Sequence, residues 1–277
     1  MSALAALVRQ HDRDRYQTAL FAPVDKREAL FALYAFNYEV ARIRESVTEP
    51  MLGQIRLQWW REVIDATYAG APTRAHEVAL PLTAAIREYG LSRVHFDRLI
   101  DARERDLDDE PPADMAALED YAEGTSATVI WLALEILDAA DPAALSVARD
   151  VGIGYALAGL LRAMPFHAST GRRYIPAELS ARTGIDPADY ERGFVSAGLR
   201  AAIGEIATAA TGHIDTARDR RGGVRRSATP ALLPAIIASR YLNRLRRTGH
   251  DPFAAGLSVP DPLQAWRLFG ASMTKRF

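Results

Sequence analysis

The chain has 277 residues, of which 49% are hydrophobic and 25% are charged, and its formal net charge is -1. This composition is typical of a soluble globular protein with a sizeable core, and it lacks the basic excess that nucleic-acid-binding proteins normally carry. Because the chain has no cysteine, disulfides, thiolate nucleophiles and cysteine-ligated zinc sites are excluded.

Apolar residues recur with helical spacing along most of the chain, and no convincing two-residue alternation typical of strands is present. Residues 1–16 lack a basic region before their short apolar run, so we expect a helix there rather than a signal peptide. Further helices are expected at residues 26–46, 51–68, 74–89, 92–107, 115–138, 142–164, 186–218, 228–247 and 261–274. No uncharged apolar run reaches the roughly 18 to 20 residues that a transmembrane helix needs.

Glycine and proline residues separate these helices, but no long linker and no internal repeat divides the chain. We therefore expect residues 1–277 to form one all-α domain of roughly eight to ten helices. Pro165 follows a long apolar segment, and because proline lacks a backbone N–H group we expect it to end or kink the helix there.

A set of segments occurs in the same order as comparable segments of squalene and phytoene synthases. These segments are residues 27–36, 55–61, 99–107, 121–129, 152–162 and 171–176. On these motifs, residues 15–247 resemble the squalene/phytoene synthase family. The resemblance implies an isoprenoid-synthase-like helical bundle around a central cavity. There, two isoprenyl diphosphates would be joined head to head while magnesium ions, held by two aspartate-rich motifs, draw off diphosphate.

Both aspartate-rich motifs are degenerate in this chain. The first has the form Asp-Asp-x-x-Asp in the family, and its register falls on residues 41–45, where Ala41 and Arg42 replace aspartates and Glu45 is the only carboxylate. The second has the form Asp-x-x-x-Asp after an arginine, and here Ala163 and His167 occupy the aspartate positions. Magnesium is expected for the family but its ligands are missing, so we predict neither a metal nor another cofactor.

Polar residues in the matched segments, or at and beside the two motif registers, are the candidates for the lining of the cavity. They are Tyr34, Asn37, Tyr38, Arg42, Glu45, Arg56, Asp101, Arg105, Asp106, Arg162, His167 and Tyr174. For each of them the alternative is a structural salt bridge or a solvated helix face. Asp101 and Arg105, for example, have the spacing of a pair across one helical turn.

Two features of this set suggest chemistry other than metal binding. An imidazole such as that of His167 can transfer protons near neutral pH. If Arg42, Arg44 and Arg162 face one cavity, that cavity is cationic and could hold an anionic head group directly, with apolar helices around a lipid tail.

Within the family, the segments at residues 36–45, 56–61 and 231–234 most resemble a divergent branch that lacks the aspartates and includes mitochondrial respiratory complex I assembly factor 6. The favoured hypothesis is therefore a non-catalytic protein that binds a lipid or a protein partner and assists assembly of a respiratory complex. The alternative is an active prenyltransferase that acts on isoprenyl diphosphates with altered metal chemistry. A purely structural interaction module is a third hypothesis. We expect a bacterial cytoplasmic protein without a nucleic-acid partner, and peripheral membrane contact stays open.

Overall fold

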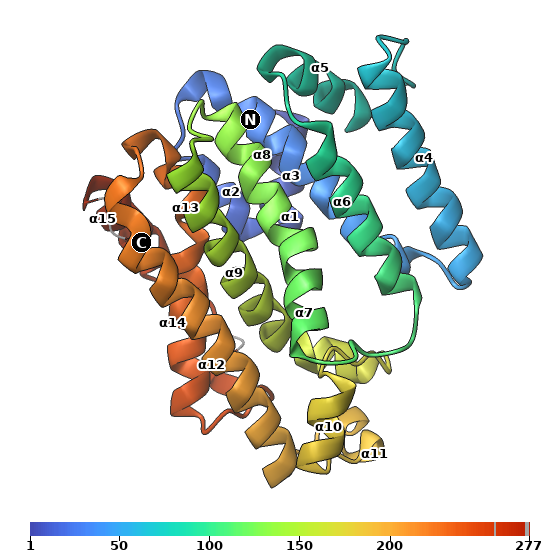
Figure 1. Cartoon of the computed structure of the whole chain (residues 1–277), viewed down its shortest axis with the longest axis vertical. Helices are drawn as coiled ribbons and strands as arrows, with labels where there is room; N and C mark the ends of the chain where they lie inside the picture. The colour runs from blue at the N-terminus through green and yellow to red at the C-terminus, as the bar shows by residue number, and fades with distance from the viewer. Residues whose placement is uncertain (258, 275–276) are drawn as a thin grey trace.

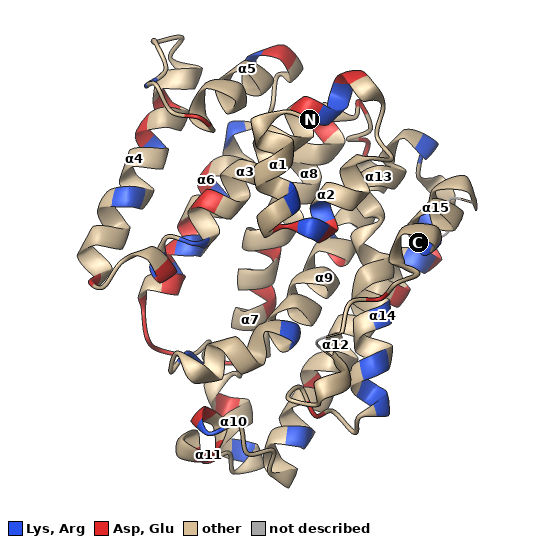
Figure 2. Ribbon diagram, turned by 180° about the vertical axis from the view of Figure 1, so that it is seen from behind, with Lys and Arg blue, Asp and Glu red and all other residues tan. Residues whose placement is uncertain are grey.

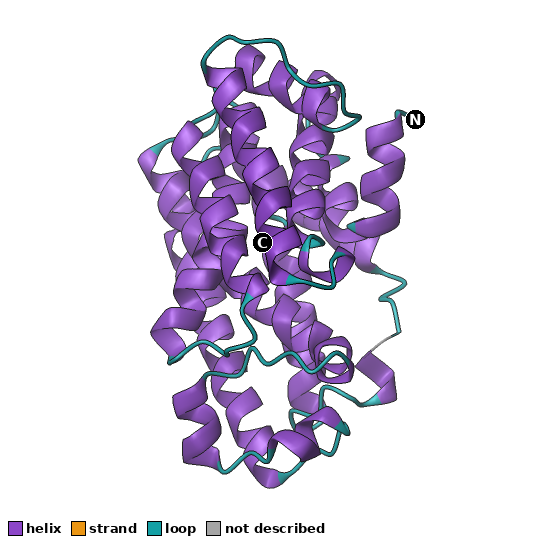
Figure 3. Ribbon diagram, turned by 90° about the vertical axis from the view of Figure 1, so that its right-hand side faces the viewer, coloured by secondary structure: helices purple, strands orange, loops and turns teal. Residues whose placement is uncertain are grey.

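A computed structural model describes residues 1–257, 259–274 and 277 (Figure 1). These residues form helices joined by loops, and there is no strand among them (Figure 3). The all-α fold that the helical periodicity predicts is confirmed.

The N-terminal segment forms two short helices, α1 (Ala3–His11) and α2 (Arg13–Ala19). The Ser2 hydroxyl accepts a hydrogen bond from the Ala5 amide, and the Asp12 carboxylate accepts one from the Arg15 amide, so each helix begins with a side-chain cap. The helix expected at this end is present, and α1 buries one apolar face against α3.

The next helices are α3 (Arg27–Ala41), α4 (Pro50–Tyr68), α5 (Ala79–Tyr89) and α6 (Arg93–Glu104). Two predicted boundaries are wrong. The helix expected at 26–46 ends at Ala41, and a turn and a short 3-10 helix follow. The helix expected at 74–89 begins at Ala79, because the His76 ring accepts hydrogen bonds from the amides at the start of α5 and holds the preceding residues in a loop.

The segment expected as one helix at 115–138 consists of α7 (Met115–Ala122), a π-helical turn (Glu123–Ala127) and α8 (Thr128–Ile136). The π-helical turn packs closely on neighbouring helices. A Cβ atom on Gly152 would lie 2.4 Å from the Ala127 backbone, so glycine is needed at that crossing.

The long helix α9 (Pro142–Ser169) contains Pro165 in its interior, so the expectation that the helix ends there is wrong. The buried side chains of Met164, His167 and Ala168 hold this last turn against the core, which offsets the hydrogen bond that proline cannot make. By length and composition α9 could cross a membrane, but 67% of its most apolar window is buried inside the protein. It packs against α8, α12 and α14, as a core helix does (Figure 1).

The C-terminal part contains α10 (Ala177–Thr183), α11 (Pro187–Glu191), α12 (Ala197–Arg220), α13 (Thr229–Leu232), α14 (Pro234–Arg247) and α15 (Gln264–Thr274). The helix expected at 186–218 is interrupted, because Gly193 adopts a left-handed conformation (φ 70°) and Ser196 caps a new helix. Short 3-10 helices lie at Val24–Lys26, Arg44–Ser46, Arg105–Leu107, Arg221–Gly223, Arg226–Ala228 and Ala255–Leu257.

Candidate functional site

A polar cavity of about 460 Å³ lies between the junction of α1 and α2, the end of α6, the π-helical turn and α9. Three charged side chains from residues 12–15 and one from α9 meet at this cavity and form two ion pairs. They are Asp12, Asp14, Arg15 and Arg162. The cavity therefore contains two charge pairs that the chain itself supplies.

The first pair joins Arg15 to Asp12, with 2.8 Å between the guanidinium nitrogen and the carboxylate oxygen. Arg15 is buried, and its guanidinium lies 5.2 Å from the ring centroid of Tyr155 and 6.0 Å from that of Tyr34. Burial acts to lower the pKa of Arg15, but the Asp12 carboxylate outweighs it and the pKa is raised. For the candidate residue Tyr34, burial has the opposite effect and raises the pKa to about 12, because it disfavours the charged phenolate. Arg15 is thus a fixed positive charge at pH 7.

The second pair joins Arg162 to Asp14 at 2.7 Å. The same carboxylate group accepts a hydrogen bond from the Gln264 amide at 2.9 Å and lies 3.5 Å from the Tyr155 hydroxyl. Asp14 therefore connects three helices, α2, α9 and α15, and holds the candidate residue Arg162 beside the cavity.

A smaller cavity of about 220 Å³ adjoins the first and shares Arg13, Asp14 and Arg162 with it. Its further lining includes Arg240, Tyr241, Arg244 and Asp261. The lining thus has four arginines and two aspartates. Tyr241 is buried, and its hydroxyl has no hydrogen-bond partner within residues 1–257, 259–274 and 277. A buried hydroxyl without a partner beside an excess of positive charge is suited to binding an anionic group.

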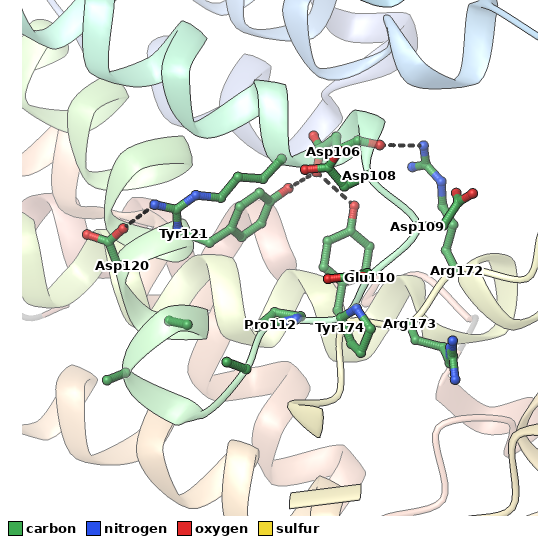
Figure 4. A pocket seen from close by; sticks show the side chains of 15 residues that line it. Asp106, Asp108, Asp109, Glu110, Pro112, Asp120, Tyr121, Arg172, Arg173 and Tyr174 are labelled. Atoms are coloured by element: carbon green, nitrogen blue, oxygen red, sulfur yellow. Dashed lines mark hydrogen bonds and ion pairs between the residues drawn. The ribbon is translucent and has the colours of Figure 1, made fainter. Parts of the chain in front are cut away.

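A cluster centred on Asp106 closes the other end of the polar cavity. The buried Asp106 carboxylate accepts hydrogen bonds from the hydroxyls of Tyr121 at 2.6 Å and Tyr174 at 2.9 Å (Figure 4). It also accepts one from the Arg103 guanidinium at 3.1 Å. Arg172 donates to the backbone oxygen of Asp106. The candidates Asp106 and Tyr174 are thus brought together, although they lie far apart in the sequence.

Beyond this cluster lies a second cavity, of about 510 Å³, formed by the loop after α6, by α7 and by the loop after α9. Tyr121 lines both this cavity and the polar one, so the Asp106 cluster is the wall between them. Acidic side chains predominate in the lining, including Asp108, Asp109 and Glu110 (Figure 4).

His167 lies against this cluster, with its ring centroid 4.6 Å from that of Tyr174. Burial lowers the pKa of His167 to about 4, and the positive charge of Arg172 contributes in the same direction. The imidazole is therefore neutral at pH 7, which corrects the expectation of a proton-transfer group near neutral pH.

The candidate residues at the end of α3 do not line the polar cavity. The Arg42 guanidinium donates to the Tyr38 hydroxyl at 3.2 Å. The Tyr38 ring stacks on the His11 ring, with 4.3 Å between the two ring centroids. Glu45 is exposed. Buried Asn37 has a side-chain oxygen without a hydrogen-bond partner in the described part of the chain.

Arg42 lines a separate cavity of about 210 Å³ with Arg56, whose guanidinium donates to the Ser46 hydroxyl at 2.6 Å. Arg44 instead pairs with Asp109 at 3.2 Å. Arg42, Arg44 and Arg162 therefore do not face one cavity, and the expectation of a single cationic pocket built from them is wrong.

The remaining two candidates form surface ion pairs. Asp101 pairs with Arg61 at 2.5 Å, and Arg105 pairs with Asp120 at 2.8 Å. The expected pair between Asp101 and Arg105 does not form, because Arg105 already belongs to the 3-10 helix after α6 and turns toward α7. Only Arg105 of these two lines a cavity, the acidic one.

The model of the squalene/phytoene synthase family matches residues 8–268. The chain belongs to this family. It is 31% identical to NADH dehydrogenase (ubiquinone) complex I, assembly factor 6 of Bos taurus, over 98% of this chain and 81% of that protein. It is 30% identical to presqualene diphosphate synthase of Rhodopseudomonas palustris, over 63% of this chain and 62% of that protein.

Solved structures of the squalene/phytoene synthase type share the fold. Squalene synthase HpnC from Alicyclobacillus acidocaldarius superposes with a TM-score of 0.79 at 23% identity, over 90% of this chain and 94% of that chain. A dehydrosqualene synthase in complex with ligand superposes with a TM-score of 0.83 at 19% identity, over 98% of this chain and 94% of that chain. The isoprenoid-synthase-like bundle is confirmed.

Magnesium is the metal that this family implies, and it requires oxygen ligands gathered around one point. At the positions of the two motifs, Glu45 is exposed, Ala163 offers no ligand and His167 is packed against Tyr174. Within residues 1–257, 259–274 and 277, no group of three or more His, Asp or Glu side chains could hold a metal ion. The residues at the motif positions do not fit a magnesium cluster.

Sequence reasoning missed several residues of the site. Asp12, Asp14 and Arg15 lie in a short N-terminal run of alternating charges, a pattern usually found on solvated surfaces. The available signal was the position of this run directly between two apolar segments of a squalene/phytoene synthase-like chain. Arg103 lies in the matched segment 99–107, and Tyr241 lies where a late helix of the family ends, but nothing in either position predicted its partners.

Proposed function

We propose that this chain is a non-catalytic member of the squalene/phytoene synthase family that binds a lipid or protein partner and assists assembly of respiratory complex I. One observation carries the proposal: the similarity to complex I assembly factor 6 extends over 98% of the chain, whereas that to a presqualene diphosphate synthase extends over 63%. The missing aspartates and the internal arginine–aspartate pairs support a role that needs no magnesium.

The expected ligand is an isoprenoid or other lipid with an anionic head group. The 220 Å³ cavity supports this expectation, because its lining has four arginines and the Tyr241 hydroxyl, which has no hydrogen-bond partner among the residues that the structure describes. We also infer that residues 1–277 form one domain, since one cluster of buried apolar side chains includes both Leu4 and Phe277.

The assembly role is tested in the organism that encodes the chain, by deleting its gene and measuring assembled complex I on native gels together with NADH–quinone oxidoreductase activity. We expect both to fall, and to recover with the wild-type chain. Expression of an active presqualene diphosphate synthase is the control and should restore neither. Normal complex I in the deletion strain would contradict the proposal.

The ligand is tested by calorimetric titration with farnesyl diphosphate and with inorganic diphosphate, each with and without magnesium. We expect binding that is independent of magnesium and about tenfold weaker in Tyr241→Phe, since a hydrogen bond to a charged group is lost. Tyr89→Phe, a change near the surface and far from this cavity, should bind like the wild type. Equal affinity of both variants would remove Tyr241 from the site.

The second candidate is an active prenyltransferase, which the 30% identity to presqualene diphosphate synthase favours. Incubation of the protein with farnesyl diphosphate and magnesium, followed by product analysis, separates the two functions. Magnesium-dependent turnover would overturn the non-catalytic proposal. Binding without turnover would agree with it.

A further inference from the structure

The C-terminal helix α15 carries an apolar stripe on its outer side. Leu263, just before the helix, and Trp266, Phe269 and Met273 within it are exposed, and Trp266 has an exposed fraction of 73%. Their spacing of three or four residues places them on one face of the helix. The opposite face is buried through Leu268 and Ala271. The exposed apolar stripe therefore has no partner within the described residues.

Arginines border this stripe. Arg240, Arg244 and Arg247 have the spacing of one face of α14, and α14 packs beside α15 (Figure 2). Arg240 and Arg267 both approach the Asp261 carboxylate, at 3.5 Å and 3.2 Å, whereas Arg244 bonds to a backbone oxygen. Arg247 is exposed and has no carboxylate partner within residues 1–257, 259–274 and 277. Two guanidinium groups thus meet one carboxylate beside the start of the stripe, and Arg244 and Arg247 continue the same basic face along α14.

We propose that α15 docks on the surface of an anionic lipid bilayer, with the stripe at 263–273 inserted among the head groups and the arginines of α14 against lipid phosphates. Tryptophan and phenylalanine favour the membrane–water interface, and an amphipathic helix lies in its plane. Basic residues beside such a helix add attraction to anionic lipids. A convex helix with its aromatic rings outward offers a protein partner no groove, which favours the bilayer over a second copy of the chain.

The α14 side of this surface shares Arg240, Arg244 and Asp261 with the 220 Å³ cavity of the proposed function. The test therefore uses Trp266, Phe269 and Arg247, which do not line that cavity, so failure of either proposal can be told apart. The full chain is mixed with vesicles of phosphatidylcholine alone or of phosphatidylcholine with phosphatidylglycerol, and binding is measured by co-sedimentation. We expect binding to the anionic vesicles that weakens as salt is raised. Trp266 is the most exposed of the four tryptophans, so brominated lipids should quench tryptophan fluorescence only in the bound state.

The vesicle affinity of variants in the stripe is compared with that of a variant at exposed apolar residues elsewhere. Trp266→Ser/Phe269→Ser should lose at least about tenfold in vesicle affinity. Arg247→Gln should lose about fivefold on anionic vesicles and nothing on neutral ones. The matched control is Met51→Ser/Ile55→Ser on α4, whose side chains are also exposed, and it should bind like the wild type.

Three results would overturn the proposal: no binding to either vesicle, equal binding to neutral and anionic vesicles, or unchanged binding of the Trp266→Ser/Phe269→Ser variant. Analytical ultracentrifugation adds a further test. Self-association that this variant abolishes, without vesicle binding by the wild type, would assign the stripe to a second copy of the chain instead.

Discussion

The ends of α3 and α9, where the sequence resemblance predicts the two aspartate motifs, differ in how their side chains are held. At the end of α3 the helix stops at Ala41 and Glu45 is exposed, and the hydrogen bond and ion pair of the Arg42 side chain go to Tyr38 and Glu39 of its own helix. At the end of α9 the helix continues through Pro165, and its side chains bind residues far away in the sequence.

The two ends therefore differ in what their polar side chains join. At the end of α3 the contacts of Arg42 stay within one helix, and such partly exposed contacts contribute little to stability. At the end of α9 the contacts reach distant residues, because Arg162 binds Asp14 and the buried His167 packs on Tyr174, itself bound to Asp106. We therefore expect the α9 end to be sensitive to substitution and to pH, and the α3 end to tolerate both.

The largest expected effect is that of Asp106→Asn. The substitution leaves the Arg103 guanidinium without its counter-charge and weakens the hydrogen bonds from Tyr121 and Tyr174. Removing one partner of a buried ion pair costs about 4 kcal/mol, to be measured as the free energy of unfolding in urea. Asp101→Asn, a change in an exposed pair, is the control and should cost less than about 0.5 kcal/mol. Equal effects of both variants would contradict the assignment of Asp106 to the core.

The next largest effect is a dependence of the free energy of unfolding on pH, which arises from His167. Its pKa is lowered from 6.5 to about 4 in the folded protein, so between these values the unfolded chain binds a proton that the folded chain excludes. The resulting loss of stability begins as the pH falls below about 6.5 and reaches about 3 kcal/mol near pH 4, whereas nothing is lost above pH 7.

The measurement compares the free energy of unfolding of wild type and His167→Asn at pH values from 4 to 7. The difference between the two proteins should shrink as the pH falls, because the variant lacks the group that titrates. A difference that stays constant over this range would show that His167 is not held neutral by burial.

A smaller effect is expected from the pair between Arg162 and Asp14. Arg162→Met removes the ion pair but keeps the apolar part of the side chain, and Asp14 retains its hydrogen bond from Gln264. Because the Arg162 side chain is nearly half exposed, solvent screens the ion pair. We therefore expect the free energy of unfolding to fall by about 1.5 kcal/mol. A double-mutant cycle with Asp14→Asn measures the coupling, and a coupling of zero would mean that the pair does not hold α9 to α2.

The helices that the sequence predicts well are those whose apolar periodicity is unbroken, such as α4 and α15. The break at Gly193 was missed because a left-handed glycine has no periodic signal, and the continuation past Pro165 depends on burial of the turn around it. The partners of the site residues are less predictable still. Asp14 and Arg162 are 148 residues apart, so only the packing of α2 on the long helices brings them together.

The smallest expected effect is that of Arg42→Ala at the end of α3. The Arg42 side chain is 41% exposed, and its contacts are a 3.2 Å hydrogen bond to Tyr38 and a 3.7 Å ion pair with Glu39, both within its own helix. Such contacts contribute within about 0.5 kcal/mol, so the urea midpoint should hardly move. A loss comparable to that of Arg162→Met would mean that Arg42 holds the end of α3 to the rest of the bundle. The two former motif positions would then be equally integrated, and the contrast between a local and a core replacement would fail.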